Sequence, residues 1–301
     1  MLFLAILQYA ILASTFTIAK VAVRYADPLF LIGVRMVLAA PIMIFIHRWQ
    51  KNNTIKIKKE DLFTFLMVGI FHIFIPFVGE FWALQFVSSA KAALTYSLTP
   101  FIAALLSYFL LKRGISPKQS LGLIIGLMGL LPLLISKDEL SFGAELLFIS
   151  LPEAVLLFVV SSACYAWFLV TKLMDKGYGI SFINGTAMLI GGVMSLALWA
   201  LVSDGQTPLK GEFAPFLFWT LLMILVANVV SYNFYGWLLK HLSITLMSAI
   251  GFLCPIFATL YGFLFLHEDL GIWHFIALFM VGSGIWLFYR EEVYKLHLVN
   301  S

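Results

Sequence analysis

Apolar runs of about 20 residues, separated by short polar linkers, recur along the whole of this 301-residue chain. A helix of that length crosses the ~30 Å hydrocarbon core of a bilayer, where backbone polar groups must be satisfied within the protein. Hydrophobic residues make up 62% of the chain and charged residues 11%, whereas about a quarter of a soluble domain is charged. The sequence therefore predicts an all-α integral membrane protein with no soluble domain.

Ten runs are long enough to cross a membrane, and we predict a transmembrane helix at each. The N-terminal run lacks a positive leader and is too long for the apolar core of a signal peptide, so we interpret it as the first span. The third span is the least regular, because it contains His72, Pro76 and Glu80. The predicted spans are 2–23, 29–47, 62–84, 90–111, 119–136, 152–173, 181–202, 214–239, 243–266 and 271–289.

Lysine and arginine orient the spans, since both accumulate in cytoplasmic loops. With both termini inside, thirteen of the 19 basic residues fall in cytoplasmic segments and four outside, while Lys20 and Arg35 lie within spans. We therefore predict that both termini are cytoplasmic. The composition, rich in Ile, Phe and Lys, is typical of an AT-rich bacterial genome and favours a bacterial inner membrane. The basic loops suit contact with anionic lipid headgroups, and no nucleic-acid partner is expected.

Two stretches half a chain apart share residues at a nearly constant offset. Five spans is an odd number, so a second copy of five enters the membrane from the opposite side, as in the inverted repeats of secondary transporters. We predict a first five-helix repeat over 1–140 and a second over 141–301. The matched pairs are Trp82 with Trp237, Ser88 with Ser243 and Pro100 with Pro255 at an offset of 155, and Lys20 with Lys172, Gly33 with Gly185 and Met36 with Met188 at an offset of 152.

This organisation resembles the drug/metabolite transporter superfamily, EamA type, over essentially the whole chain. The most characteristic stretch is CPIFATLYGFLFLHEDLGIWHFIALFMVGSGIWLF, residues 254–288, with Pro255 in the ninth span, Glu268 at its end and a glycine-rich tenth span. In the matching stretch of the first half, Arg113 stands where the family usually has glutamate. The resemblance implies a secondary transporter and no enzyme activity.

Charged and titratable side chains inside spans are costly and usually face a cavity. Lys20, Arg35, Glu80 and Lys91 all fall in the predicted outer half of the membrane, and we predict a charged, substrate-binding vestibule there. Lys20 and Lys91 alternatively extend to the headgroups. Arg35 either pairs with Glu80 or binds a substrate carboxylate or phosphate, and Glu80 is also a candidate proton or cation site. His72 is a candidate proton relay, with a hydrogen-bonded packing role as the alternative.

The aromatic and amide side chains suggest the rest of the substrate site. Tyr96, Tyr232 and Asn228 lie deep in their spans and are predicted substrate contacts, since aromatic faces hold flat rings or organic cations. Trp82 and Trp167 are equally consistent with an interfacial aromatic belt.

Pro100 and Pro255 occupy matched positions, and we predict paired mid-helix hinges beside the substrate cavity. The glycines of GLIIGLMGLL, from Gly122 to Gly129, favour close helix packing. No Walker motif, metal cluster or catalytic constellation is visible in the sequence, so we expect no catalytic residues, no bound metal and no cofactor.

We predict a secondary transporter that moves a small organic metabolite by alternating access. The mixed charge of the vestibule suits an amino acid or an amino-acid derivative, and the aromatic residues add a place for a nucleoside, as in S-adenosylmethionine. The alternative is an exporter of hydrophobic or cationic drugs, and the third class is a membrane enzyme or lipid flippase. Small-molecule substrate and lipid bilayer are the expected partners, and the oligomeric state is left open between monomer and homodimer.

Overall fold

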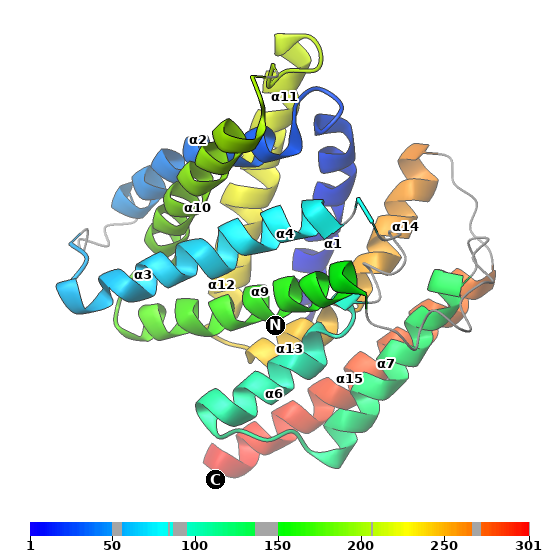
Figure 1. Ribbon diagram of the computed structural model, residues 1–301. Helices are drawn as coiled ribbons and strands as arrows, with labels where there is room; N and C mark the ends of the chain where they lie inside the picture. Colours follow the sequence, from blue (N-terminus) through cyan, green and yellow to red (C-terminus); the bar gives the residue numbers. More distant parts are fainter. Residues whose placement is uncertain are drawn as a thin grey trace. The chain divides into compact units, whose positions relative to one another are not determined.

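The computed structural model describes residues 1–49, 56–83, 85–86, 95–135, 150–205, 207–266 and 272–300 (Figure 1). Within these ranges the regular structure is helical, and the only extended pairing is one isolated bridge between Ala26 and Leu209. The prediction of an all-α fold is confirmed for this part of the chain. The elements are α1 (Leu2–Ala22), α2 (Pro28–Trp49), η1 (Lys59–Asp61), α3 (Leu62–Val68), η2 (Gly69–Phe74), α4 (Ile75–Ala83), α6 (Thr99–Leu111), α7 (Pro117–Ile135), α9 (Leu151–Asp175), α10 (Ile180–Val202), α11 (Phe213–Met223), η3 (Ile224–Ser231), α12 (Tyr232–Leu238), α13 (Ile244–Ile250), α14 (Leu253–Leu266) and α15 (Ile272–Asn300).

Seven helical stretches of the described residues are long and apolar enough to cross a membrane. Most predicted spans agree with these helices to within a few residues. Three differ. The predicted start of the fourth span, 90–94, lies outside the described residues, α15 continues well past the predicted end at 289, and the ninth span is divided between α13 and α14 by a turn at Gly251 and Phe252.

The chain forms two compact units, and each unit takes residues from both halves of the sequence. Unit 1 comprises Met1–Ala13, Ala83–Ser161 and Leu242–Ser301, and unit 2 comprises Ser14–Trp82 and Ser162–His241. The candidate functional residues of the second and third predicted spans therefore share a unit with those of the seventh and eighth.

Unit 2 is built on the packing of α2 against α10, which lie along each other in Figure 1. Glycines bring the two backbones close: a Cβ on Gly33 would lie 2.5 Å from the Leu196 side chain, and one on Gly185 would lie 3.0 Å from Met43. An early residue of each helix thus contacts a late residue of the other, so the two helices are antiparallel. Their buried apolar side chains join those of α3, η2 and η3 in one core.

Two further membrane-length helical stretches of unit 2 contain a π-helical segment, η2 between α3 and α4 and η3 between α11 and α12. Pro76 explains the first segment locally, because a proline has no N–H with which to bond the carbonyl of His72 four residues earlier. The segments begin at Gly69 and Ile224, which are 155 residues apart. Such segments are frequent at functional sites.

Unit 1 is built on the packing of α7 against α15 (Figure 1). A Cβ on Gly122 would lie 2.6 Å from the Gly284 carbonyl oxygen, so these backbones are in direct contact, and the predicted close packing of this glycine-rich segment is confirmed. Polar contacts fix one end of the pair: Gln119 Nε2 donates to Glu292 at 2.7 Å, and Lys118 Nζ lies 3.5 Å from a Glu291 carboxylate oxygen.

The matched prolines lie at helix starts, so the predicted mid-helix position is wrong. Pro100 is in the first turn of α6, after a turn at Ser97 and Leu98, and Pro255 is in the first turn of α14, after the turn at Gly251 and Phe252. Proline is well tolerated there, because the first N–H groups of a helix have no intrahelical acceptor. Whether these two breaks act as hinges remains a prediction.

Candidate functional site: a buried arginine and an aromatic cluster

Several buried polar side chains of unit 2 each keep at least one polar atom without a hydrogen-bond partner among the described residues. In folded proteins such atoms are rare, and each calls for an explanation, of which a ligand or water is one. Five of them come from five different elements, α2, η2, α10, α11 and η3. They are Arg35, His72, Asn184, Thr220 and Asn228.

Arg35 is the most costly of these groups, because it is 5% exposed in the middle of an apolar helix. Its guanidinium carbon lies 4.8 Å from the centre of the Phe77 ring, and Nη1 lies 4.0 Å from the sulfur of Met223. Glu80 and Tyr232 are close enough to interact with it electrostatically. The ion pairs of the described residues do not include one between Arg35 and Glu80, and Arg35 Nε has no hydrogen-bond partner among them.

Tyr232 belongs to a group of four neighbouring rings, which we call the aromatic cluster. The other three rings are those of His72, Trp167 and Tyr235. The ring of His72 stands edge-on to Trp167 at 4.5 Å and to Tyr232 at 5.2 Å between centroids. Trp167 lies 4.2 Å from Tyr235 and 6.1 Å from Tyr232. His72 is 4% exposed, and neither ring nitrogen has a hydrogen-bond partner in the described part of the chain. The alternative of a hydrogen-bonded packing histidine therefore has no support here.

Amide side chains hold the eighth span beside the cluster. Asn228 Nδ2 donates to the sulfurs of Met36 at 3.2 Å and Met188 at 3.7 Å, two methionines that the sequence repeat pairs with each other. Asn184 Nδ2 donates to the Tyr232 carbonyl oxygen at 3.4 Å. In both amides the side-chain oxygen has no partner among the described residues. The predicted contact Asn228 thus lies in the same core as Arg35, with an acceptor unused.

Six of the predicted site residues belong to unit 2, namely Lys20, Arg35, His72, Glu80, Asn228 and Tyr232. Tyr96, Pro100 and Pro255 belong to unit 1. Lys91 lies outside the described residues, as does the side chain of Lys20. From the sequence, Trp167 was as consistent with an interfacial aromatic belt as with the substrate site. The hydrophobic pattern of an apolar helix does not distinguish a ring that faces lipid from a ring in the core.

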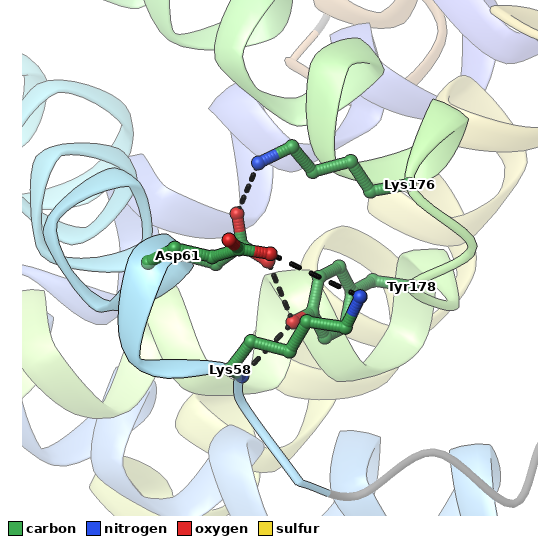
Figure 2. A network of polar contacts seen from close by, with 5 residues as sticks. Lys58, Asp61, Lys176 and Tyr178 are labelled. Atoms are coloured by element: carbon green, nitrogen blue, oxygen red, sulfur yellow. Dashed lines mark hydrogen bonds and ion pairs between the residues drawn. The ribbon is translucent and has the colours of Figure 1, made fainter.

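Unit 2 contains a second polar group that was not predicted from the sequence (Figure 2). Asp61, only 1% exposed, forms an ion pair with Lys176 and accepts a hydrogen bond of 2.8 Å from the Tyr178 hydroxyl. The same hydroxyl accepts from the Lys58 backbone N–H at 3.1 Å. These contacts, which we call the Asp61 network, tie the start of α3 to the loop between α9 and α10. The partners are more than 100 positions apart, so no local pattern marks them.

The electrostatics of the Asp61 network favour its charged form. The hydrogen bond with the Asp61 carboxylate raises the pKa of the Lys176 ammonium group. Burial raises the pKa of the Tyr178 hydroxyl, which therefore stays protonated and able to donate. In the predicted orientation this network lies at the cytoplasmic end of unit 2.

Comparison with known proteins places the chain in a family. The sequence profile of the EamA-like transporter family matches residues 1–135 and 152–290. The chain belongs to the EamA-like transporter family. The predicted resemblance to the drug/metabolite transporter superfamily is thereby confirmed, and the chain is a multi-pass helical membrane protein of a transporter family.

Relatives of this EamA-like transporter include named proteins. The Chlamydia muridarum protein named S-adenosylmethionine/S-adenosylhomocysteine transporter is 31% identical over 100% of this chain and 95% of its own length. A Chlamydia trachomatis protein of the same name is also 31% identical, with 92% of its length covered. The uncharacterized Bacillus subtilis transporter YoaV is 24% identical over 91% of both chains. A solved crystal structure that is 16% identical superposes with a TM-score of 0.72 over 95% of this chain and 93% of that chain, which shows a common fold.

Proposed function

We propose that this protein is a secondary transporter that carries S-adenosylmethionine and S-adenosylhomocysteine, or closely similar amino-acid derivatives, across the bacterial inner membrane by alternating access. The observation that carries this proposal is Arg35, a buried guanidinium without an ion-pair partner among the described residues. Its planar fork binds carboxylates in a bidentate manner, which fits the amino-acid end of such a substrate. Glu80, within electrostatic range of Arg35, would attract the substrate ammonium group.

The relatives and the aromatic cluster support the choice of substrate. Two chlamydial proteins named as transporters of this pair of metabolites are 31% identical to the chain over its full length. Both metabolites combine a zwitterionic amino acid with an adenosine, and unit 2 combines a buried cation with four neighbouring rings. Asn228, Lys20, Lys91 and Tyr96 remain predicted contacts in this proposal.

We further propose ten transmembrane helices in two inverted repeats, with both termini in the cytoplasm. Three observations support the repeat. The π-helical segments start 155 residues apart, which is the offset of the matched tryptophans and prolines. Within unit 2, α2 packs antiparallel to α10, its counterpart in the second half, and within unit 1 α7 packs against its counterpart α15. The family profile also matches two stretches of the chain, 1–135 and 152–290.

A second candidate function, export of hydrophobic or cationic drugs, is favoured by the aromatic cluster taken alone, because aromatic faces attract organic cations. Arg35 opposes it, since a fixed positive charge in the same unit repels a cation unless Glu80 neutralises it. A lipid flippase has no specific observation in its favour.

Uptake by proteoliposomes tests the proposed function. Purified full-length protein is reconstituted and supplied with radiolabelled S-adenosylmethionine, with S-adenosylhomocysteine inside or absent, and with or without a proton gradient. We expect uptake above that of protein-free liposomes, accelerated by internal S-adenosylhomocysteine. A panel of amino acids, drugs and lipids runs in parallel. Transport of a cationic drug without any transport of S-adenosylmethionine would select the exporter instead.

A further inference from the structure

The antiparallel pair of α2 and α10 is held at both of its ends by contacts between linkers. The linker before α2 meets the linker after α10 at one end of unit 2, and the linker after α2 meets the linker before α10 at the other. In the predicted orientation the first contact is outside and the second, the Asp61 network, is cytoplasmic. At an offset of 152, the proposed repeat pairs Lys58 with Lys210. It also pairs Tyr178 with Ala26, so the two contacts are counterparts of each other.

Backbone groups make the outer contact, which we call the outer tie. Two backbone hydrogen bonds of 2.8 and 2.9 Å link residues 25–27 to residues 208–210, and they flank the isolated bridge between Ala26 and Leu209. Ala26 is 0% exposed and belongs to an apolar core with Phe216. Opening the outer tie would leave backbone groups without partners and would expose this core, and both changes are costly.

Side chains make the cytoplasmic contact (Figure 2). Asp61 pairs with Lys176 and accepts a hydrogen bond from the Tyr178 hydroxyl. The Lys176 side chain is 41% exposed, so water can replace its partner as soon as the ion pair breaks. Asp61 is the last residue before α3, and its carboxylate reaches water when the start of that helix moves outward. Opening this end exchanges polar contacts within the protein for polar contacts with water, which costs less than opening the outer tie.

Apolar side chains lie directly beneath the Asp61 network. Phe65 and Val68 follow Asp61 at spacings of four and seven, so the three side chains share one face of α3. Phe65 is 1% exposed and stands edge-on to the Tyr178 ring at 5.1 Å between centroids, and Val68 is 0% exposed. The Asp61 network therefore closes the cytoplasmic end of the unit 2 core over this face.

We propose that the Asp61 network is a releasable latch that opens the cytoplasmic end of unit 2 during transport, while the outer tie stays closed. Release breaks the ion pair of Asp61 with Lys176 and the hydrogen bond from Tyr178, and the start of α3 then moves away from the loop between α9 and α10. A closure that opens in every transport cycle must be broken and remade at little cost. The latch rests on the proposed alternating access and is independent of which substrate is carried.

Cross-linking of each end tests this asymmetry in a protein whose two natural cysteines are replaced. Asp61→Cys and Lys176→Cys are joined by a short bifunctional thiol reagent that a reductant removes, and uptake of S-adenosylmethionine by proteoliposomes is measured. We expect uptake to be lost on cross-linking and restored on reduction. Ala26→Cys with Leu209→Cys is the matched control. Facing residues of such a bridge lie about 4.5 Å apart between Cα atoms, within the range of a disulfide, and its oxidation should leave uptake unchanged.

The other outcomes of cross-linking would overturn the proposal. Uptake that survives the cross-link between positions 61 and 176 would mean that the cytoplasmic end stays closed during transport. Loss of uptake in both cross-linked proteins would mean that the two ends do not differ as proposed.

The accessibility of two buried positions gives a second measurement that needs neither a substrate nor the double variant. Val68→Cys reports the face beneath the latch and Ala26→Cys reports the outer tie, each treated in lipid nanodiscs with a hydrophilic thiol reagent. Tyr178→Phe keeps the ring and removes only the hydroxyl of the latch. We expect Tyr178→Phe to speed the labelling of Val68→Cys and to leave that of Ala26→Cys unchanged. Faster labelling at both positions would show a general loss of stability and overturn the latch, as would unchanged labelling at Val68→Cys.

Failure of the proposed function is recognised separately from failure of the latch. Absence of S-adenosylmethionine uptake by the wild type, together with faster labelling of Val68→Cys alone in Tyr178→Phe, would refute the proposed substrate and support the latch. Uptake by the wild type with no change of labelling in Tyr178→Phe would support the proposed function and refute the latch.

Discussion

The guanidinium carbon of Arg35 lies 4.8 Å from the centre of the Phe77 ring, in a core where the described residues give Arg35 no ion pair. A cation over an aromatic face recovers only part of the hydration that it loses on burial. Methionine in its place would fill similar space at no such cost. The arginine is therefore better explained by what it binds than by what it stabilises.

Replacement of this side chain is the first test. We expect Arg35→Met to fold and to lose at least tenfold in affinity for S-adenosylhomocysteine, because a hydrogen bond to a charged group is worth about 1.5–3 kcal/mol. Adenosine, which has no carboxylate, should bind it as it binds the wild type. Both are measured as inhibition of residual uptake and as shifts of Tm.

The double variant Arg35→Met, Glu80→Gln separates this role from a structural pair. Removing one partner of a buried pair costs about 3–5 kcal/mol, whereas removing both can be nearly neutral. A substrate-binding Arg35 predicts no recovery in the double variant. Full recovery of transport there would show that the two side chains serve only each other.

The hydrophobic pattern predicted the fold class and most helix positions, because a membrane-crossing helix must be both long and apolar. It missed the break at Gly251 and Phe252 and the π-helical segments η2 and η3. None of these ends an apolar run, because the few polar side chains in them, such as His72 and Asn228, leave each stretch apolar enough to cross a membrane. The mid-helix placement of Pro100 failed because the turn before it, at Ser97 and Leu98, is only two residues long and does not separate two apolar runs in the sequence.

The candidate site was predictable only in part. Arg35, Glu80 and His72 stood out because titratable groups are rare inside spans. Trp167 did not, since tryptophan is common at membrane interfaces. The pair of Asp61 and Lys176 was not predicted, because contact across more than 100 positions depends on tertiary structure that a single sequence does not display.

The contact between α7 and α15 predicts a contrast between two neighbouring glycines. A Cβ on Gly284 would lie 2.5 Å from the Gly122 carbonyl oxygen, whereas nothing lies within 4 Å of one on Gly282. Overpacking of this kind typically costs about 1–3 kcal/mol, so Gly284→Ala should lower Tm in detergent. Gly282→Ala should leave Tm unchanged or raise it, since alanine favours helices. Equal effects of the two substitutions would show that the helices do not pack through Gly284.

The helix breaks before Pro100 and Pro255 predict an effect on transport rate. Both prolines start a helix after a turn, and alanine would allow the helix to extend back through that turn. We expect each substitution to Ala to lower the maximal uptake rate more than the substrate affinity. Unchanged rates in both variants would leave the prolines as ordinary helix starts.

The predicted orientation places Asn52 and Lys295 in the cytoplasm and Asp138 and Asp204 outside. Single cysteines are introduced at these positions after replacement of the two natural cysteines, both of which are free in the structure. An impermeant thiol reagent applied to intact cells should label the cysteines at 138 and 204 and leave those at 52 and 295 unlabelled until the cells are opened. Labelling of Asn52→Cys in intact cells would reverse the orientation.

The Asp61 network predicts an asymmetry between its two charged partners. Asp61 is 1% exposed, and the Lys176 side chain is 41% exposed. Lys176→Met removes the ion pair of a buried carboxylate, which keeps the hydrogen bond from the Tyr178 hydroxyl, whereas Asp61→Asn leaves an ammonium group that reaches water. We therefore expect Lys176→Met to lower Tm by more than Asp61→Asn, and the double variant to lower it by less than the sum of the two.

The same network fixes the pH at which this comparison is made. Because the pKa of Lys176 is raised in the folded protein, its stabilising effect is complete below the ordinary pKa of lysine and is lost only as pH rises through the raised value. At pH 7 the full effect is therefore measured. Glu60→Gln is the matched control, since Glu60 pairs with Lys58 at 3.9 Å with both side chains about 70% exposed, and such surface pairs contribute little. If Lys176→Met changed Tm no more than Glu60→Gln does, the network would contribute no more to stability than a surface ion pair.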